Sequence, residues 1–138
     1  MFHLIHNRIN GADDNAQTAF LQSWITSHTQ DAGYLGKPLL VTEFGRSSKQ
    51  FSPAQRDAFY WAAYNAVYAS ARASGPCTGA LFWQYLGKGM DNFRDGYEVI
   101  FQESSSTASI ISQQSRRIAR LNGPRAASET KEVDKPKN

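Results

Sequence analysis

The stretch Lys37-Pro38-Leu39-Leu40-Val41-Thr42-Glu43-Phe44-Gly45 predicts a short buried strand that carries one carboxylate at its carboxyl end. Gly45 then lets the backbone leave the strand for a polar loop. A second stretch of the same kind, Gly79-Ala80-Leu81-Phe82-Trp83-Gln84-Tyr85, ends near an indole instead of an acid. The ends of these two strands are therefore the first place to look for function.

A helix is predicted between the two strands. Ser52-Pro53-Ala54-Gln55 supplies an N-cap serine, a proline at the first helical position and a glutamine that can bond back to the cap. The helix should run to about Ser74, before Gly75-Pro76. Strands joined by such a helix are parallel, and their carboxyl ends lie on the same face. We therefore predict that Glu43 and Trp83 share a cleft.

Two further helices flank this unit. The first is predicted from Asp14 to about Ala32, with Asp14 and Gln17 as its capping pattern and Gly33 and Gly36 as its end. Ser105 or Ser106 is expected to cap the last helix, and Asn122-Gly123-Pro124 should end it. The chain then divides into an unassigned segment 1–12, an α/β body 13–122 and a basic tail 123–138 that we expect to be disordered.

The composition is that of one folded domain. The chain has 138 residues, of which 41% are apolar and 12% aromatic, enough to build a core. No apolar run approaches the ~20 residues of a membrane span, and the first residues lack the pattern of a secretory signal. Cys77 is the only cysteine, so it is expected to be a small buried residue. His3 and His6 give no case for a metal, and we expect neither a metal nor another cofactor.

The net charge of +3 comes from the end of the chain. Residues 116–138 hold seven basic and three acidic side chains, whereas the rest is nearly neutral. The basic region 116–125 could bind a polyanion or a partner protein, but no aromatic residues interleave the basic ones, as they do in nucleic-acid surfaces. We favour the alternative that Arg116, Arg117 and Arg120 lie in the last turns of a helix and offset its dipole. Neither nucleic acid nor a membrane is expected as a partner.

Four stretches of the sequence form a distinctive pattern: residues 35–45, residues 79–84, Gly89-Met90 and Asp95-Gly96-Tyr97-Glu98-Val99. Together, and in this order, they resemble the C-terminal third of plant-type endo-β-1,4-mannanases of glycoside hydrolase family 5. The likeness covers roughly residues 13–121. It implies an α/β fold that is part of a (β/α)8 TIM barrel, namely a C-terminal portion with about two barrel strands and three helices.

The resemblance also implies a chemistry. It gives Glu43 the role of catalytic nucleophile and Trp83 that of a platform under the sugar, because the apolar face of a pyranose packs well on an indole. The implied reaction is retaining hydrolysis of β-1,4-mannosidic bonds in mannan, galactomannan and glucomannan, by a secreted protein that acts on cell-wall polysaccharide. A retaining glycosidase needs two carboxyl groups. The family's acid/base glutamate follows an asparagine, and no Asn-Glu dipeptide occurs in this chain.

Several alternatives stay open at this point. The chain could be an inactive remnant or a weak carbohydrate-binding fragment, and cellulose is the nearest rival substrate because family 5 enzymes share the catalytic pair. Glu43 could merely pair with a basic neighbour such as Arg46, and Trp83 could be a core residue. The oligomeric state is not indicated by the sequence.

Overall fold

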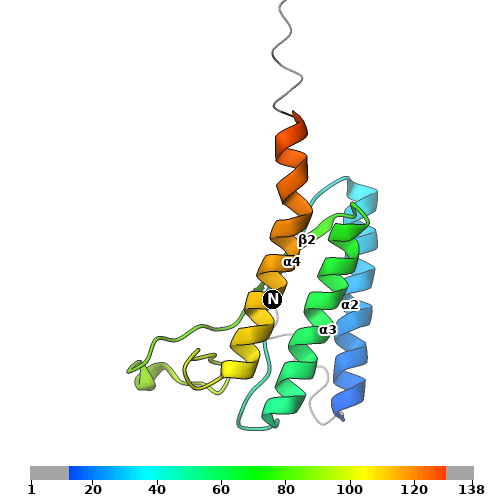
Figure 1. The fold of residues 1–138 in the computed structure, drawn as a ribbon. Coiled ribbons are helices and arrows are strands. Elements are labelled where there is room, and N and C mark those ends of the chain that lie inside the picture. The colour runs from blue at the N-terminus through cyan, green and yellow to red at the C-terminus, as the bar shows by residue number, and fades with distance from the viewer. Residues whose placement is uncertain (1–12, 130–138) are drawn as a thin grey trace, which may run out of the picture.

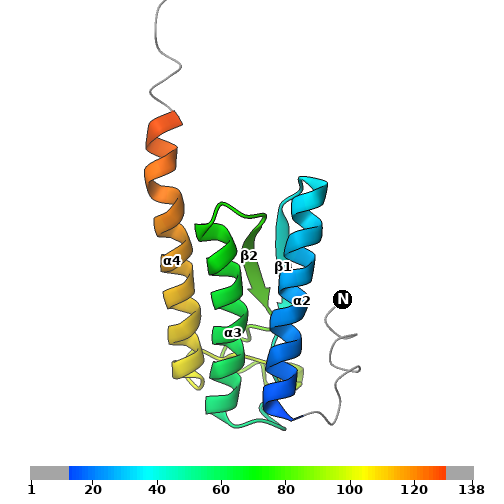
Figure 2. The ribbon, with the colours of Figure 1, turned by 90° about the vertical axis from the view of Figure 1, so that its right-hand side faces the viewer.

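The computed structural model describes residues 13–129, in which a layer of helices covers one face of a two-stranded sheet (Figure 1). The helices α2, α3 and α4 stand side by side, with the strands behind them in the view of Figure 2. In chain order the elements are α2 (Asp14–Leu35), β1 (Leu39–Phe44), α3 (Pro53–Arg72), β2 (Cys77–Phe82), the short 3-10 helix η1 (Asp91–Phe93) and α4 (Ser105–Glu129). His3 and His6 lie outside the described residues.

The predicted parallel unit is confirmed. Strands β1 and β2 pair in parallel, with Leu39 opposite Cys77 and Val41 opposite Ala80. Helix α3 connects them and packs on the sheet. Strand β2 ends at Phe82, earlier than the sequence indicated, so Trp83 is the first residue beyond it. The carboxyl ends of both strands therefore lie at one end of the molecule, as expected.

The core between sheet and helices is aromatic. The ring of Phe44 lies 5.2 Å from the rings of both Tyr60 and Tyr64, and Tyr60 lies 6.1 Å from Phe82. Burial raises the pKa of both tyrosines, so their hydroxyls stay neutral. Cys77 is buried as predicted. The rings of α3 therefore pack against Phe44 and Phe82, the last residues of β1 and β2.

The predicted helix ends are confirmed at Ser52 and Gly36, whereas the predicted caps Ser105 and Ser106 both lie inside α4. The capping box of α3 is confirmed, with the Gln55 N–H donating to Ser52 and the Ser52 N–H donating to the Gln55 side chain at 3.0 Å. Gly36 ends α2 with φ 60°. The predicted cap Asp14 is wrong, because Asp13 accepts from the Ala16 N–H at 2.8 Å. Asp14 is the first helical residue, and its carboxylate binds Arg46 instead.

The end of α4 also differs from the prediction. The helix continues through Gly123 and Pro124 to Glu129 and extends beyond the other two helices in Figure 1. A proline deletes its own hydrogen bond to the preceding turn, but Ala126 and Ala127, which follow it, favour helix. None of the helices in residues 13–129 is both long and apolar enough to cross a membrane.

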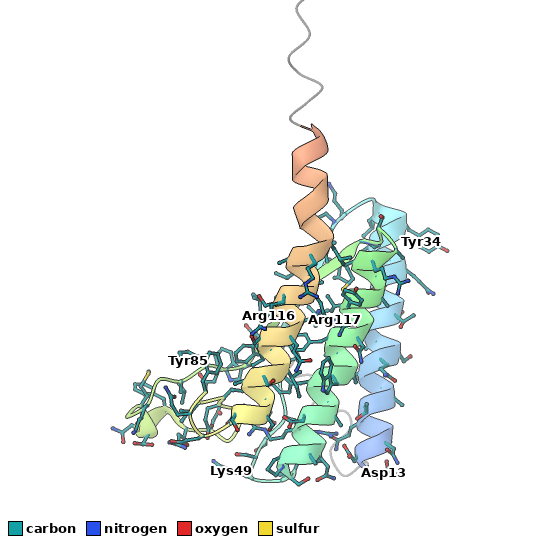
Figure 3. All side chains as sticks on the ribbon, in the orientation of Figure 1. Asp13, Tyr34, Lys49, Tyr85, Arg116 and Arg117 are labelled. Atoms are coloured by element: carbon teal, nitrogen blue, oxygen red, sulfur yellow. The ribbon has the colours of Figure 1, made fainter. Side chains whose placement is uncertain are left out.

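Because α4 is longer than expected, Arg116, Arg117 and Arg120 lie in the middle of the helix and cannot offset charge at its end. Arg117 stacks on Tyr68, with the guanidinium carbon 3.9 Å from the ring centre, and donates to Asn65 at 3.0 Å (Figure 3). It thereby joins α4 to α3 through a cation–π contact. The expected role of Arg117 at the helix terminus is wrong, and its contacts are those of a packing residue.

Candidate active site

The carboxyl end of β1 contains a bulge at Glu43. Two residues separate Val41 from Phe44 on β1, whereas one residue separates their partners Ala80 and Phe82 on β2. Glu43 itself has φ 59°, in the left-handed region that residues other than glycine seldom occupy. Such bulges and strained residues occur preferentially next to active sites.

The bulge decides where the carboxylate lies. In a regular strand, residues 41 and 43 would share a face, and Glu43 would be directed into the aromatic core. The structure instead buries Val41 and Phe44 and leaves Glu43 exposed. The extra residue therefore turns the phenyl ring inward and the acid outward.

Trp83 lies beside this bulge. Its backbone N–H donates to the Phe44 carbonyl at 2.8 Å, so the chain segments that carry Glu43 and Trp83 are directly bonded. The contact is close enough to require a glycine, because a β-carbon at Gly45 would lie 2.3 Å from the Trp83 carbonyl oxygen. The structure thus brings the two predicted site residues to the same rim. The alternative of a core tryptophan is wrong, since Trp83 is 44% exposed.

One carboxylate holds the indole by its edge. Asp95 accepts from Trp83 Nε1 at 3.3 Å, from Gln84 Nε2 at 3.1 Å and from the Tyr97 N–H at 2.8 Å. Partial burial alone would raise the pKa of Asp95, but the hydrogen bonds from Tyr97, Trp83 and Gln84 outweigh it and lower the pKa below its ordinary value. The acid is therefore charged at neutral pH and acts as an acceptor.

The segment that carries Asp95 is itself tied to the sheet. Val99 pairs with Tyr85 in a parallel bridge, and the Val99 N–H donates to the Gln84 carbonyl at 2.7 Å. At the same turn the Gly96 N–H donates to the Glu98 side chain at 2.6 Å. The loop from Gly87 to Gly96 thus returns to the strand end from which it left.

The alternative partner for Glu43 is occupied elsewhere. Arg46 is 2% exposed, forms an ion pair with Asp14 and donates to Gln17 at 2.9 Å. Its guanidinium carbon also lies over two rings, 4.1 Å from the centre of Phe51 and 4.7 Å from that of Phe59. Arg46 therefore fastens the loop between β1 and α3 to the start of α2, and its side chain is buried.

The sheet face opposite the helices is uncovered in the described part of the chain. Leu40 is 50% exposed and Leu81 58% exposed, although both belong to strands. On the flank between β2 and α4 lies a hollow of about 400 Å³ whose lining includes Leu81, Tyr85 and Ile118. Apolar strand residues of this kind normally face further structure, so both surfaces indicate a part of a larger fold.

Metal ligands are lacking in this region. Among residues 13–129, no group of three His, Cys, Asp or Glu side chains could hold a metal ion. The sequence pointed to Glu43 and Trp83, whose roles stay predictions, and it did not point to Asp95, which the structure bonds to Trp83. The available signal was Asp95-Gly96-Tyr97, a turn dipeptide followed by a residue whose backbone N–H the aspartate can bind.

The chain is similar in sequence to named plant enzymes. It is 49% identical over 113 residues to mannan endo-1,4-beta-mannosidase 1 of Oryza sativa subsp. japonica. It is 46% identical over 110 residues to mannan endo-1,4-beta-mannosidase 7 of Arabidopsis thaliana, and 42% identical over 122 residues to enzyme 4 of Solanum lycopersicum. These alignments include 80%, 78% and 86% of this chain, respectively. The chain is a homologue of the plant mannan endo-1,4-β-mannosidases.

The chain matches only part of each of these relatives. The chain of this mannanase homologue spans only 26%, 26% and 31% of those three relatives. No protein-family model matches it. That it corresponds to the C-terminal third of its relatives stays a prediction.

The fold agrees with the sequence. A crystal structure of a glycoside hydrolase family 5 mannosidase from Rhizomucor miehei superposes with a TM-score of 0.69 at 18% identity, covering 84% of this chain and 35% of that one. At this identity the likeness concerns the fold alone. The fold is thus that of part of a (β/α)8 barrel, to which residues 13–129 contribute two parallel strands and three long helices. A closed barrel puts residues such as Leu40 and Leu81 in its interior, which explains their exposure here.

Proposed function

We propose that this chain forms part of an endo-β-1,4-mannanase in which Glu43 is the nucleophile and Trp83 the platform for the sugar under attack. The observation that carries the proposal is the bulge at Glu43, which directs a carboxylate out of the core beside an exposed indole. In barrel enzymes, catalytic groups lie at the carboxyl ends of the strands, and both residues are at such ends. The plant relatives named as mannanases support the substrate class.

The proposed chemistry is a double displacement. The Glu43 carboxylate attacks the anomeric carbon, the bond to the leaving oxygen breaks, and a second carboxylic acid gives that oxygen its proton. The second group then takes a proton from water, which attacks the same carbon and releases Glu43. The two carboxyl groups must be about 5–5.5 Å apart. Asp95 accepts three hydrogen bonds and is held in its charged form, so it suits an acceptor and not a proton donor.

We infer that the proton donor belongs to sequence outside this chain. In the family that the chain resembles, the acid/base glutamate follows an asparagine, and the 138 residues contain no Asn-Glu dipeptide. We therefore expect the isolated chain to show no hydrolysis of galactomannan above background. A robust rate from the 138-residue chain would mean that a second carboxylate is present in it and that this inference is wrong.

A joined protein tests the nucleophile directly. The unmatched part of the Arabidopsis relative, fused to this chain, should hydrolyse galactomannan, and Glu43→Gln should reduce the rate by on the order of 10³-fold or more. Glu103→Gln, at an exposed acid bonded to Arg94, is the matched control and should leave the rate unchanged. Equal activity of the Glu43→Gln protein and the parent fusion would refute the assignment.

A second candidate function is weak carbohydrate binding without hydrolysis. The exposed aromatic rings of Trp83, Tyr85 and Phe93 favour it, because all three follow β2 on the side of the strand ends. Retardation of the isolated chain in a galactomannan gel, lost in Trp83→Ala, would support binding by the fragment alone. Comparing that retardation with a cellulose derivative would separate mannan from its rival substrate. Secretion, which the resemblance implies, stays a proposal.

A further inference from the structure

The hydrogen bonds that Asp95 accepts from Trp83 and its neighbours point to a role for this aspartate, beside the proposed pair Glu43 and Trp83. The carboxylate of Asp95 receives three N–H groups, from two consecutive side chains and from the backbone of Tyr97, at 3.3, 3.1 and 2.8 Å. The bond from Tyr97 fixes the aspartate to its own turn, which leaves the other oxygen, Oδ2, to receive Trp83 and Gln84. The aspartate is thus oriented before it orients the indole.

We propose that Asp95 is a positioning residue that clamps the indole of Trp83 by its edge and so presents a ring face to the sugar at the ends of β1 and β2. The proposal rests on the function proposed for Trp83 and deepens it. An indole N–H lies in the plane of the ring, so a bond to Nε1, together with the attachment of the ring to the backbone, restricts rotation of the ring without covering its faces. Trp83 is 44% exposed even with this bond in place, so part of its surface is open to a ligand.

A carboxylate is the group that this position needs. It offers two acceptor oxygens and no donor, which matches N–H groups approaching from two sides. An amide has one oxygen, and its NH₂ group would face either Tyr97 or the two side chains. Asp95→Asn should therefore keep one half of the network and lose the other, whereas Asp95→Ala should lose both.

Exposed loops commonly contain aspartates that only stabilise a turn, and the structure distinguishes Asp95 from these. Asp91, in the same loop, bonds Arg94 at 2.7 Å, and Arg94 in turn bonds Glu103. That cluster ties the loop to the segment just before α4 and does not include Trp83. Asp91 is thus a matched control with the same side chain in the same loop.

The first test reads the indole itself. In ¹⁵N spectra of the 138-residue chain, loss of one of three indole signals in Trp83→Phe assigns the Trp83 Nε1–H. Hydrogen exchange of this group should accelerate roughly tenfold in Asp95→Ala, less in Asp95→Asn, and not at all in Asp91→Asn. Unchanged exchange in Asp95→Ala would overturn the clamp, whatever the fate of the proposed function.

The second test reads the sugar. In the fusion with the Arabidopsis relative, Asp95→Ala should lower kcat/KM for mannohexaose roughly five- to tenfold while the urea midpoint stays within the range of the Asp91→Asn control. A fall in the midpoint that accounts for the whole loss would reduce Asp95 to a turn residue and overturn the proposal. If Trp83→Phe and the parent hydrolyse mannohexaose equally, the platform assignment itself fails, even with the exchange result intact.

Discussion

The close approach of Gly45 to Trp83 gives the sharpest prediction of this structure. In Gly45→Ala the new methyl carbon would lie 2.3 Å from the Trp83 carbonyl oxygen, whereas real contacts of this kind stay above 3.0 Å. The two backbones must separate by about 0.7 Å, the difference between these distances. Overpacking of this size costs about 1–3 kcal/mol.

The change should be visible at one amide. Because the Trp83 N–H donates to Phe44 at 2.8 Å, separation of the backbones exposes this group to solvent. Hydrogen exchange of the Trp83 amide should accelerate roughly 5- to 150-fold, which corresponds to the same range of free energy. In the fusion protein the variant should also lose most hydrolytic activity, since it moves the segment beside Glu43.

Gly33→Ala supplies the matched control. Gly33 lies inside α2, and a β-carbon there would meet nothing within 4 Å. The same chemical change should stabilise the helix by about 0.5–1 kcal/mol. If Gly45→Ala left the Trp83 amide as protected as in the parent, or if Gly33→Ala did equal damage, the argument from close approach would be refuted.

Three further predictions concern the frame around the site. Arg46→Lys keeps the charge but loses the planar contacts with Asp14, Gln17 and two rings, so we expect a loss of about 1.5–3 kcal/mol in urea unfolding, and an unchanged midpoint would count against it. Leu81→Thr, on the uncovered face, should reduce self-association of the isolated chain in light scattering without destabilising it, and an unfolded variant would show that Leu81 is a core residue. Because the pKa of Asp95 is lowered, the clamp is fully present at neutral pH and is lost as the pH falls through that depressed pKa. The Trp83 indole signal should thus stay constant down to about pH 4, and movement near pH 6 would contradict this.

Much of the frame could be predicted because its signals are local. The Ser52 cap, the glycine that ends α2 and the two apolar runs each act within a few residues of themselves. The parallel pairing of the strands followed from the helix between them. Where two local signals competed, as at Asp13 and Asp14, the choice depended on a distant partner, Arg46, which no window of sequence contains.

The sequence by itself determined the helices, the strands and the delivery of one acid and one indole to neighbouring strand ends. Only the tertiary structure decided the direction of the acid, because the bulge at Glu43 depends on how Phe44 packs against the rings of α3. It also brought Asp95 back to Trp83 across a loop whose course is set by pairing with the segment after β2. Hydrogen bonds of this kind join residues that the chain separates, so their partners are fixed by packing and not by local propensity.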